Sequence, residues 1–515
     1  MSSMRPFLTG LLVMGVTLIA TCGVRSASAD ADPGEGVAMR AYDLINALDF
    51  DKARAELAKA DPNSPSVAVA KARLALYEED CDLATALTVG AAAARDDEGR
   101  IIADVARGCA RVTAATATDH DDAQGVWVRW QDEDDRALMP LIVDTVVKAR
   151  SSLTRDLGVE WKRPLRITVV RDLLSLSAMT GLPYKSAQTT GTVAVAKWGR
   201  VTILSPRASK HGYPWRDTLT HELTHLAISM QTHERAPLWL HEGVARRQEV
   251  RWREPGPFDD RPTPESIVQR GMELKLDLQL DKLGPSIAML PSADAAMVAF
   301  AEVTSFVRFY VENQGDAALA KLLVAIRTAK NVDEALVQSS GETLAQWDVK
   351  WRANLARRTK EPLSPLFGLG GSPPTGAGDA HERARLAELL LGRNHPVEAF
   401  AQVEKVPETL FSDPSLRYLK GRILEAKGDA PGAGVLVDDP KAWIASYGPC
   451  WGLRARLAFA KSDAGEGNAS LNEAIAHDPF DISTACMRPD PAVTPTESPL
   501  CVAARKRGEP DIGND

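Results

Sequence analysis

His221-Glu222-Leu223-Thr224-His225 lies near the middle of this 515-residue chain, and Pro237-Leu238-Trp239-Leu240-His241-Glu242-Gly243-Val244-Ala245 follows shortly after it. Residues four apart share one face of an α-helix, so His221 and His225 can contact a single metal ion. Glu222 is placed to reach a water on that ion. Glu242, on a second helix that would start at Pro237, is the candidate third ligand. Two histidines and a glutamate with an open fourth position are typical of a catalytic zinc site.

The residues around the first stretch predict a well-defined helix. Asp217 is a suitable N-cap residue before Thr218. An apolar stripe recurs at intervals of four, three and four residues, at Leu219, Leu223, Leu226 and Met230. This stripe would pack the helix and leave the histidine pair on a neighbouring face. A helix that carries two histidines by accident would seldom combine a cap, a core stripe and a third ligand.

Together the two stretches resemble the gluzincin metallopeptidases, and in particular the peptidase MA-like domains of exported bacterial proteins. The similarity rests on HELTH at 221–225, on APLWLHEGVA at 236–245 and on Phe300 to Leu355, and it extends over about Val126 to Arg358. It implies an α+β, zincin-like domain with a small mixed sheet and two active-site helices. It also implies one Zn²⁺ ion held by His221, His225 and Glu242, with Glu222 as the general base.

This resemblance implies zinc-dependent hydrolysis of peptide bonds in envelope or extracellular polypeptides, with Glu222 activating the metal-bound water. The partner would then be a peptide or protein substrate. A second hypothesis is a helical-repeat scaffold that binds a protein partner and carries a zinc site with little or no peptidase activity. An intact Glu222 favours the enzyme, because a scaffold has no need of a base.

Several residues near the proposed site keep more than one interpretation. A Tyr or His that would help to hold the oxyanion could be Tyr310, Tyr213, His211, His233 or His241, and Phe300 stands where relatives often have Tyr. His241 is expected to be a neighbour of the ligands or a surface residue. Glu249 could bond a ligand histidine, but a solvated charge is the preferred interpretation.

Composition shifts divide the chain into six expected segments. They are a signal peptide (1–29), a helical repeat-like segment (30–115), the peptidase MA-like domain (125–360), a Gly/Pro-rich linker (361–379), a second helical repeat-like segment (380–488) and a loosely ordered Pro-rich tail (489–515). Both helical segments resemble tetratricopeptide repeats. Residues 116–124 are expected to be a polar linker. Short strands are predicted at 126–130, 165–170, 192–195 and 201–204, with a turn at Trp198-Gly199.

The N-terminal residues and the overall charge indicate where the protein works. Arg5, an apolar stretch from Phe7 to Ala20 and the small residues Ala27-Ser28-Ala29 predict an export signal cleaved after Ala29. A lipoprotein anchored at Cys22 is the alternative. No later segment is long and apolar enough to span a bilayer. The net charge of −8 and the lack of a basic stripe argue against nucleic acid as a partner.

Cleavage after Ala29 would leave five cysteines, none at CxxC spacing. Sequence nearness pairs Cys81 with Cys109 and Cys486 with Cys501, which leaves Cys450 single. Buried free thiols are the alternative.

Overall fold

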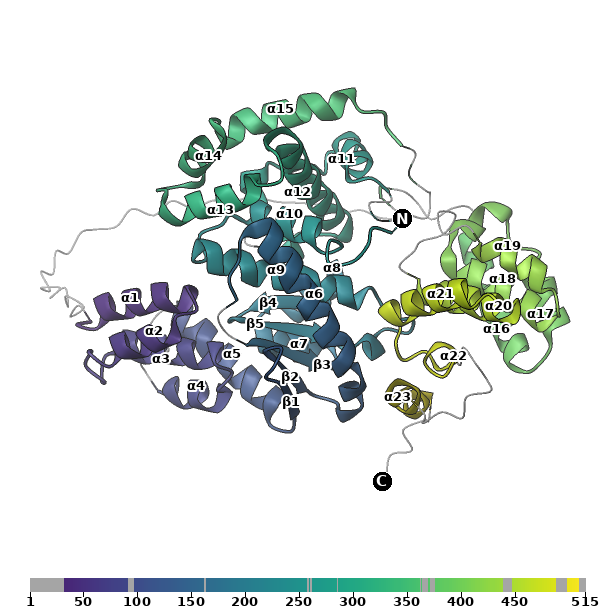
Figure 1. The fold of residues 1–515 in the computed structure, drawn as a ribbon, viewed down its shortest axis with the longest axis horizontal. Helices are drawn as coiled ribbons and strands as arrows, with labels where there is room; N and C mark the ends of the chain where they lie inside the picture. The colour runs from purple at the N-terminus through teal and green to yellow at the C-terminus, as the bar shows by residue number, and fades with distance from the viewer. Residues whose placement is uncertain are drawn as a thin grey trace, which may run out of the picture.

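A computed structural model describes residues 32–90, 97–161, 164–256, 259, 262–284, 286–361, 363, 369–370, 376–438, 447–487 and 498–508 (Figure 1). The expected signal peptide and Cys22 lie outside these residues, as does much of the predicted 361–379 linker. Within the described ranges, every helix is too short or too polar to cross a membrane.

A five-stranded mixed sheet forms the centre of the fold. Its strands follow the order β1-β2-β3-β5-β4. The inner strands β2, β3 and β5 are parallel, and the outer strands β1 and β4 run antiparallel to their neighbours. The bounds are Ala117–Asp121 (β1), Val126–Trp130 (β2), Leu165–Val170 (β3), Ala194–Lys197 (β4) and Arg200–Leu204 (β5). The predicted strands are thus confirmed, although β4 starts two residues later than expected.

The expectation of a polar linker at 116–124 is wrong, because β1 lies within it. This strand is an edge strand whose alternate residues Thr118 and His120 are exposed, so its sequence carries no apolar alternation. The His120 ring stacks on Trp127 of β2 with ring centroids 4.6 Å apart. The two strands form a hairpin through residues 122–125, which the polar composition of β1 does not reveal.

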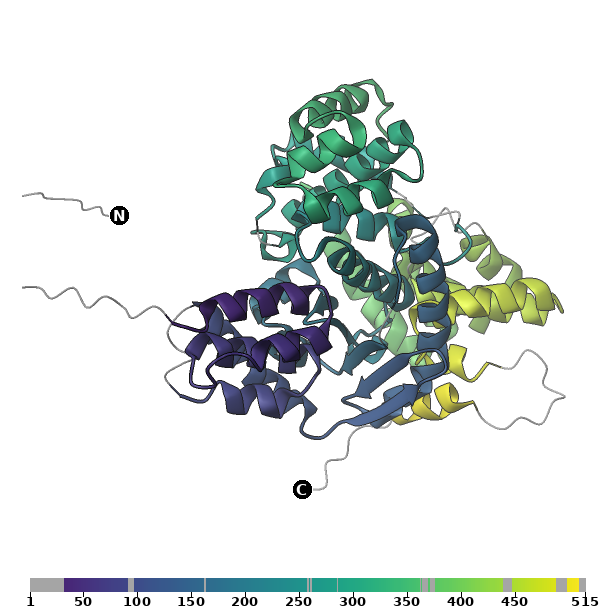
Figure 2. The same cartoon turned by 60° about the vertical axis from the view of Figure 1, so that its left-hand side comes forward.

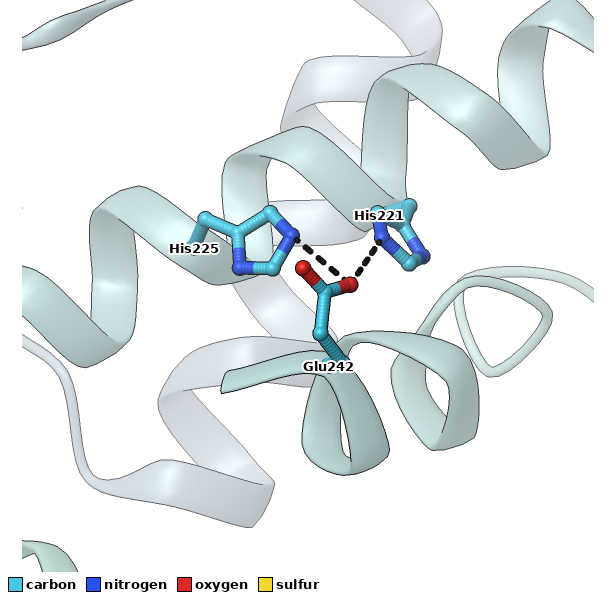
Figure 3. Close-up of side chains that lie close together, drawn as sticks. All are labelled: His221, His225 and Glu242. Carbon is cyan, nitrogen blue, oxygen red and sulfur yellow. Dashed lines mark ion pairs between the residues drawn. The ribbon is translucent and has the colours of Figure 1, made fainter. Parts of the chain in front are cut away.

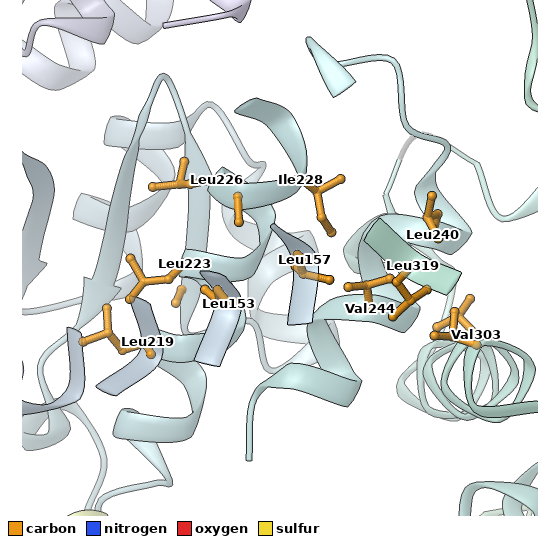
Figure 4. Packing of buried hydrophobic residues seen from close by; sticks show 14 of the residues in the cluster. Leu153, Leu157, Leu219, Leu223, Leu226, Ile228, Leu240, Val244, Val303 and Leu319 are labelled. Carbon is orange, nitrogen blue, oxygen red and sulfur yellow. The ribbon is translucent and has the colours of Figure 1, made fainter. Parts of the chain in front are cut away.

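One face of the sheet packs on two long helices, α6 (Met139–Leu157) and α9 (Trp215–Thr232). The inward residues alternate along the strands, as a half-buried sheet requires: Val126, Val128, Leu165, Ile167, Val201 and Ile203. The same core continues through the helical layer into α10, α12 and α13, as the packing of Leu223, Leu157, Val244 and Leu319 shows (Figure 4). The helix that carries the two histidines is therefore fixed in the largest core of the protein.

The other face of the sheet is covered by the N-terminal helices α1 (Glu35–Asn46), α2 (Phe50–Leu57), α3 (Pro65–Tyr77), α4 (Cys81–Leu87) and α5 (Asp97–Thr113), together with α7 (Leu173–Thr180). Polar residues of the sheet form hydrogen bonds with this N-terminal segment. The fully buried Arg200 donates to the Leu76 carbonyl at 2.5 Å, and Thr168 donates to Glu79 at 2.7 Å. Trp198 packs edge-on against Tyr77. These helices pair along the chain and share a core with the sheet.

A second helical layer follows α9 and lies above the sheet in Figure 1. It contains α10 (Leu238–Gln248), α11 (Pro264–Glu273), α12 (Ala293–Gln314), α13 (Ala318–Thr328), α14 (Val332–Ser340) and α15 (Leu344–Arg357). Between α7 and β4, the short helix α8 (Tyr184–Thr190) reaches up to contact this layer at α12.

The C-terminal helices pack beside the sheet domain (Figure 2). They are α16 (Ala377–Gly392), α17 (Pro396–Val403), α18 (Pro414–Ala426), α19 (Ala430–Val437), α20 (Gly448–Ala460), α21 (Ala464–His477), α22 (Ile482–Ala485) and α23 (Pro499–Gly508). Successive helices pair along the chain, as in a repeat array.

The prediction that 489–515 is loosely ordered is wrong for residues 498–508. Helix α23 buries Ala503 in the central core, and its Lys506 pairs with Asp134 at 2.6 Å. A disulfide joins Cys501 to Cys486, and a second one joins Cys81 to Cys109. Both predicted pairs are confirmed, and Cys450 is free and buried.

Candidate metal centre

Helix α9 places His221 and His225 on one face and its apolar stripe on another. Leu219, Leu223 and Leu226 are almost fully buried against the sheet and α6. The helix begins at Trp215, so the prediction that Asp217 is the N-cap is wrong. Asp217 lies in the first turn, where it accepts hydrogen bonds from Trp252 at 2.8 Å and Arg253 at 3.0 Å. These bonds tie the start of α9 to the chain beyond α10.

Close packing of α10 brings Glu242 to the histidines. A Cβ atom at Gly243 would lie 2.5 Å from the Val303 carbonyl oxygen and 2.5 Å from the Val307 side chain, both on α12. Such distances are far below van der Waals contact, so only glycine permits this approach. Helix α10 is thereby held between α9 and α12, with Glu242 on the side that faces α9.

His221, His225 and Glu242 converge on one point (Figure 3). The Oε2 atom of Glu242 lies 3.5 Å from Nε2 of His221 and 3.7 Å from Nε2 of His225. One ligand atom from each residue lies within 4.8 Å of the other two. Two imidazole nitrogens and one carboxylate oxygen at this spacing could hold a divalent ion such as Zn²⁺ with an open fourth position.

The ionisation of this group is set by burial and by the local carboxylates. Burial lowers the pKa of His225 to about 3, so its imidazole is neutral, as a metal ligand must be. Burial also disfavours the charged form of His221, but its hydrogen bonds to Glu242 and Glu249 prevail and raise its pKa to about 10. Burial would raise the pKa of Glu242, but His225 and His221 lower it to about 2. In the metal-free protein the positive charge of protonated His221 therefore offsets the negative charges of Glu242 and Glu249.

Glu249 contacts His221, which corrects the expectation that it is a solvated charge. Its Oε2 atom lies 2.9 Å from Nδ1 of His221, on the ring side away from Glu242. Arg246 donates to the other oxygen of Glu249 at 3.0 Å and stacks over Phe300. A carboxylate on the far nitrogen fixes the orientation of a ligand imidazole and raises its basicity.

His241 has the equivalent place beside the second histidine. Its Nδ1 atom lies 3.4 Å from Nδ1 of His225. Burial lowers the pKa of His241, so both rings are neutral and one donates to the other. The two histidines thus have unlike neighbours, a carboxylate beside His221 and a neutral imidazole beside His225.

Glu222 is buried, with 7% of its surface exposed, and its Oε2 atom accepts a hydrogen bond from the backbone N–H of Ala196 at 2.5 Å. Burial raises the pKa of Glu222 to about 7, although the nearby His221 opposes this shift. A pKa near neutrality suits a general base. Ala196 belongs to β4, the edge strand beside α9, whereas β5 lies inside the sheet. Of these two strands, only β4 has a side without a neighbouring strand.

Of the five candidates for an oxyanion donor, only His241 contacts the ligand group. Tyr310 is buried beside Trp347 and bonds Ser339 at 3.4 Å. Tyr213 donates its hydroxyl to the Leu204 carbonyl. His211 packs against Tyr447.

His233, at the end of α9, lines a cavity of about 1040 Å³ between α1, α13 and the α9 C-terminus. None of the four proposed site residues lines that cavity.

Residues 145–357 match the model of the Peptidase MA superfamily. This segment runs from α6 to the end of α15 and contains both histidines, Glu222 and Glu242. The chain therefore carries a Peptidase MA superfamily domain, a metallopeptidase-like class, between its N-terminal and C-terminal helices. Comparison with curated proteins and with solved structures found no match.

Proposed function

We propose that the protein is a zinc-dependent peptidase, with His221, His225 and Glu242 as the ligands of one Zn²⁺ ion and Glu222 as the general base. The observation that carries the proposal is the convergence of the three side chains within 4.8 Å, inside a Peptidase MA superfamily domain. His225 is neutral and Glu242 is ionised, as metal ligands must be, and His221 would release its proton when the ion binds. A bound zinc ion supplies Lewis-acid chemistry, because it acidifies water and polarises a carbonyl.

The residues of the chain would perform the other parts of the reaction. Glu222 takes a proton from the attacking water and delivers it to the leaving amine. Glu249 and His241 hold the rings of His221 and His225, respectively, in the orientation that faces Glu242. The edge strand β4 offers backbone groups beside Glu222, and an extended polypeptide can pair with such an edge. The substrate class is therefore an extended or unfolded polypeptide.

Export to the periplasm or the extracellular space is part of the proposal, with the lipoprotein at Cys22 as the alternative. The two disulfides support an oxidising compartment, because such bonds are rare in the cytosol. The substrates would then be envelope or extracellular polypeptides.

A helical-repeat scaffold with an inactive zinc site remains the second candidate. The observation that favours it is the C-terminal array, whose paired helices α16 to α21 provide a surface for a protein partner. The two candidates differ in whether Glu222 is needed.

Metal analysis combined with one substitution tests the proposal. The mature protein is expected to bind one zinc ion and to cleave an unfolded protein, and Glu222→Gln is expected to keep the metal and lose turnover. Turnover unchanged by Glu222→Gln would remove the mechanism. Zinc binding without hydrolysis of a broad peptide library would favour the scaffold.

A further inference from the structure

The hairpin geometry decides which backbone groups of β4 face outward. Trp198 and Gly199 both have positive φ, at 57° and 66°, which is typical of a two-residue type I′ turn. Such a turn is flanked by a hydrogen-bonded pair, here Lys197 and Arg200. Because hydrogen-bonded pairs alternate in an antiparallel ladder, Val195 pairs with Thr202 in the same way. The bond from the Leu204 N–H to the Val193 carbonyl, at 2.8 Å, continues this alternation.

Ala194 and Ala196 therefore point their N–H and C=O groups away from β5, toward the open edge of the sheet. These are the groups that an added strand would use. One of them, the Ala196 N–H, already has a partner, because it donates to Oε2 of Glu222. The general base of the proposed reaction thus occupies a pairing position on the strand that would bind the substrate.

We propose that the Ala196–Glu222 hydrogen bond is a latch, which an extended substrate opens when its backbone pairs with β4. The inference rests on the proposed peptidase function and concerns the regulation of the same site. A substrate carbonyl that accepts from the Ala196 N–H takes the place of the Glu222 carboxylate. Glu222 is then released from β4 beside His221. Before that event its Oε2 atom is held by the Ala196 N–H.

The latch can be observed in the free protein by hydrogen exchange with mass spectrometry. An amide that is hydrogen-bonded to a buried carboxylate exchanges slowly. Glu222→Ala is expected to speed exchange at Ala196 and to leave Val195 and Lys197, which face β5, unchanged. Equal exchange at Ala196 in the two proteins would overturn the proposal.

Competition for the same N–H can be measured by binding in zinc-free protein, where no turnover occurs. The probe is fluorescein-labelled casein, an unfolded polypeptide, followed by anisotropy. Since a hydrogen bond to a charged group must be broken in the wild type, Glu222→Ala is expected to bind the probe about 10-fold more tightly. Equal affinity for the two proteins would contradict the latch.

Proline substitutions separate the latch from a general effect of charge. Proline has no N–H, and an edge strand tolerates it where the N–H faces outward. In an Ala196→Pro background, the effect of Glu222→Ala on probe affinity is expected to vanish. In the matched Ala194→Pro background, which removes the other outward N–H, the effect of Glu222→Ala is expected to remain. An effect that persists in Ala196→Pro would assign it to charge repulsion and overturn the latch.

The outcomes are distinguishable from those for the peptidase proposal. Altered exchange and binding without any turnover would support competition between Glu222 and an added strand for the Ala196 N–H, and would refute the enzyme assignment. Turnover that depends on Glu222, with unaltered exchange and binding, would support the peptidase proposal and overturn the latch.

Discussion

The Nδ1 atom of His221 lies 2.9 Å from Oε2 of Glu249, and Glu242 approaches the opposite nitrogen of the same ring. Helix α10 thus supplies Glu242, the third candidate ligand. Its C-cap residue, Glu249, supports His221, the first candidate ligand. One close helix contact, made at Gly243, positions both carboxylates. The metal centre therefore depends on how α10 packs against its neighbours.

Removing the charge of Glu249 is expected to weaken zinc binding. Zn²⁺ and a proton compete for His221, and the dication interacts with the Glu249 carboxylate about twice as strongly as the proton does. Glu249→Gln therefore weakens zinc binding more than it weakens protonation of His221. The expected loss is about 10- to 100-fold in affinity, measured by competition with a chelator. Glu312→Gln, which removes an exposed carboxylate paired with Arg358, is the matched control and should leave affinity unchanged. Equal affinities for both variants would exclude a role for Glu249.

Zinc affinity is expected to rise with pH across the neutral range. The pKa of His221 in the metal-free protein is about 10, so below that pH its imidazole is protonated and must lose a proton to bind metal. Each pH unit gained should raise the apparent affinity about tenfold until that pKa is passed. Isothermal titration calorimetry in buffers of different ionisation enthalpy would count the released proton. A pH-independent affinity between pH 7 and 9, corrected for the chelator and the buffer, would be incompatible with this pKa.

Enlarging Gly243 is expected to disturb both stability and metal binding. The new methyl group of Gly243→Ala would meet the Val303 carbonyl, so α10 must shift and carry Glu242 away from the histidines. We expect a loss of about 2 kcal/mol in unfolding free energy, measured in urea, together with weaker zinc binding. Gly378→Ala in α16 meets no atom within 4 Å and serves as the control. A normal zinc affinity in Gly243→Ala would show that the approach at this residue does not position Glu242.

Arg200→Ala is expected to detach the N-terminal helices from the sheet. Arg200 is fully buried and donates to the Leu76 carbonyl, so its removal leaves a cavity and takes away one of the two donors to that carbonyl, the other being the Glu79 N–H. The expected cost is about 3 kcal/mol, seen as a lower urea midpoint. Arg100→Ala, at an exposed position of α5, should change stability by less than about 0.5 kcal/mol. If both variants unfolded at the wild-type midpoint, Arg200 would not join the two parts.

Local sequence was sufficient for much of the fold. The 3.6-residue period of Leu219, Leu223 and Leu226 predicted α9 and the face on which His221 and His225 lie, because side chains four residues apart share a helix face. Runs of β-branched residues predicted β2 and β3 with their observed bounds. Nearness along the chain predicted both disulfides. These features depend on neighbours within a few turns or on short loops.

Other features depended on contacts between distant parts of the chain. Three examples are the docking of α23, the support of His221 by Glu249 and the hydrogen bond from Ala196 to Glu222. Each joins residues whose proximity no local pattern encodes. A polar side chain has the same appearance in a sequence whether water or a buried imidazole faces it. By itself the sequence determined which residues could bind a metal and on which helix face. Only the tertiary structure decided which partners support them, because packing of α10 against α12 and of α9 against β4 sets those distances.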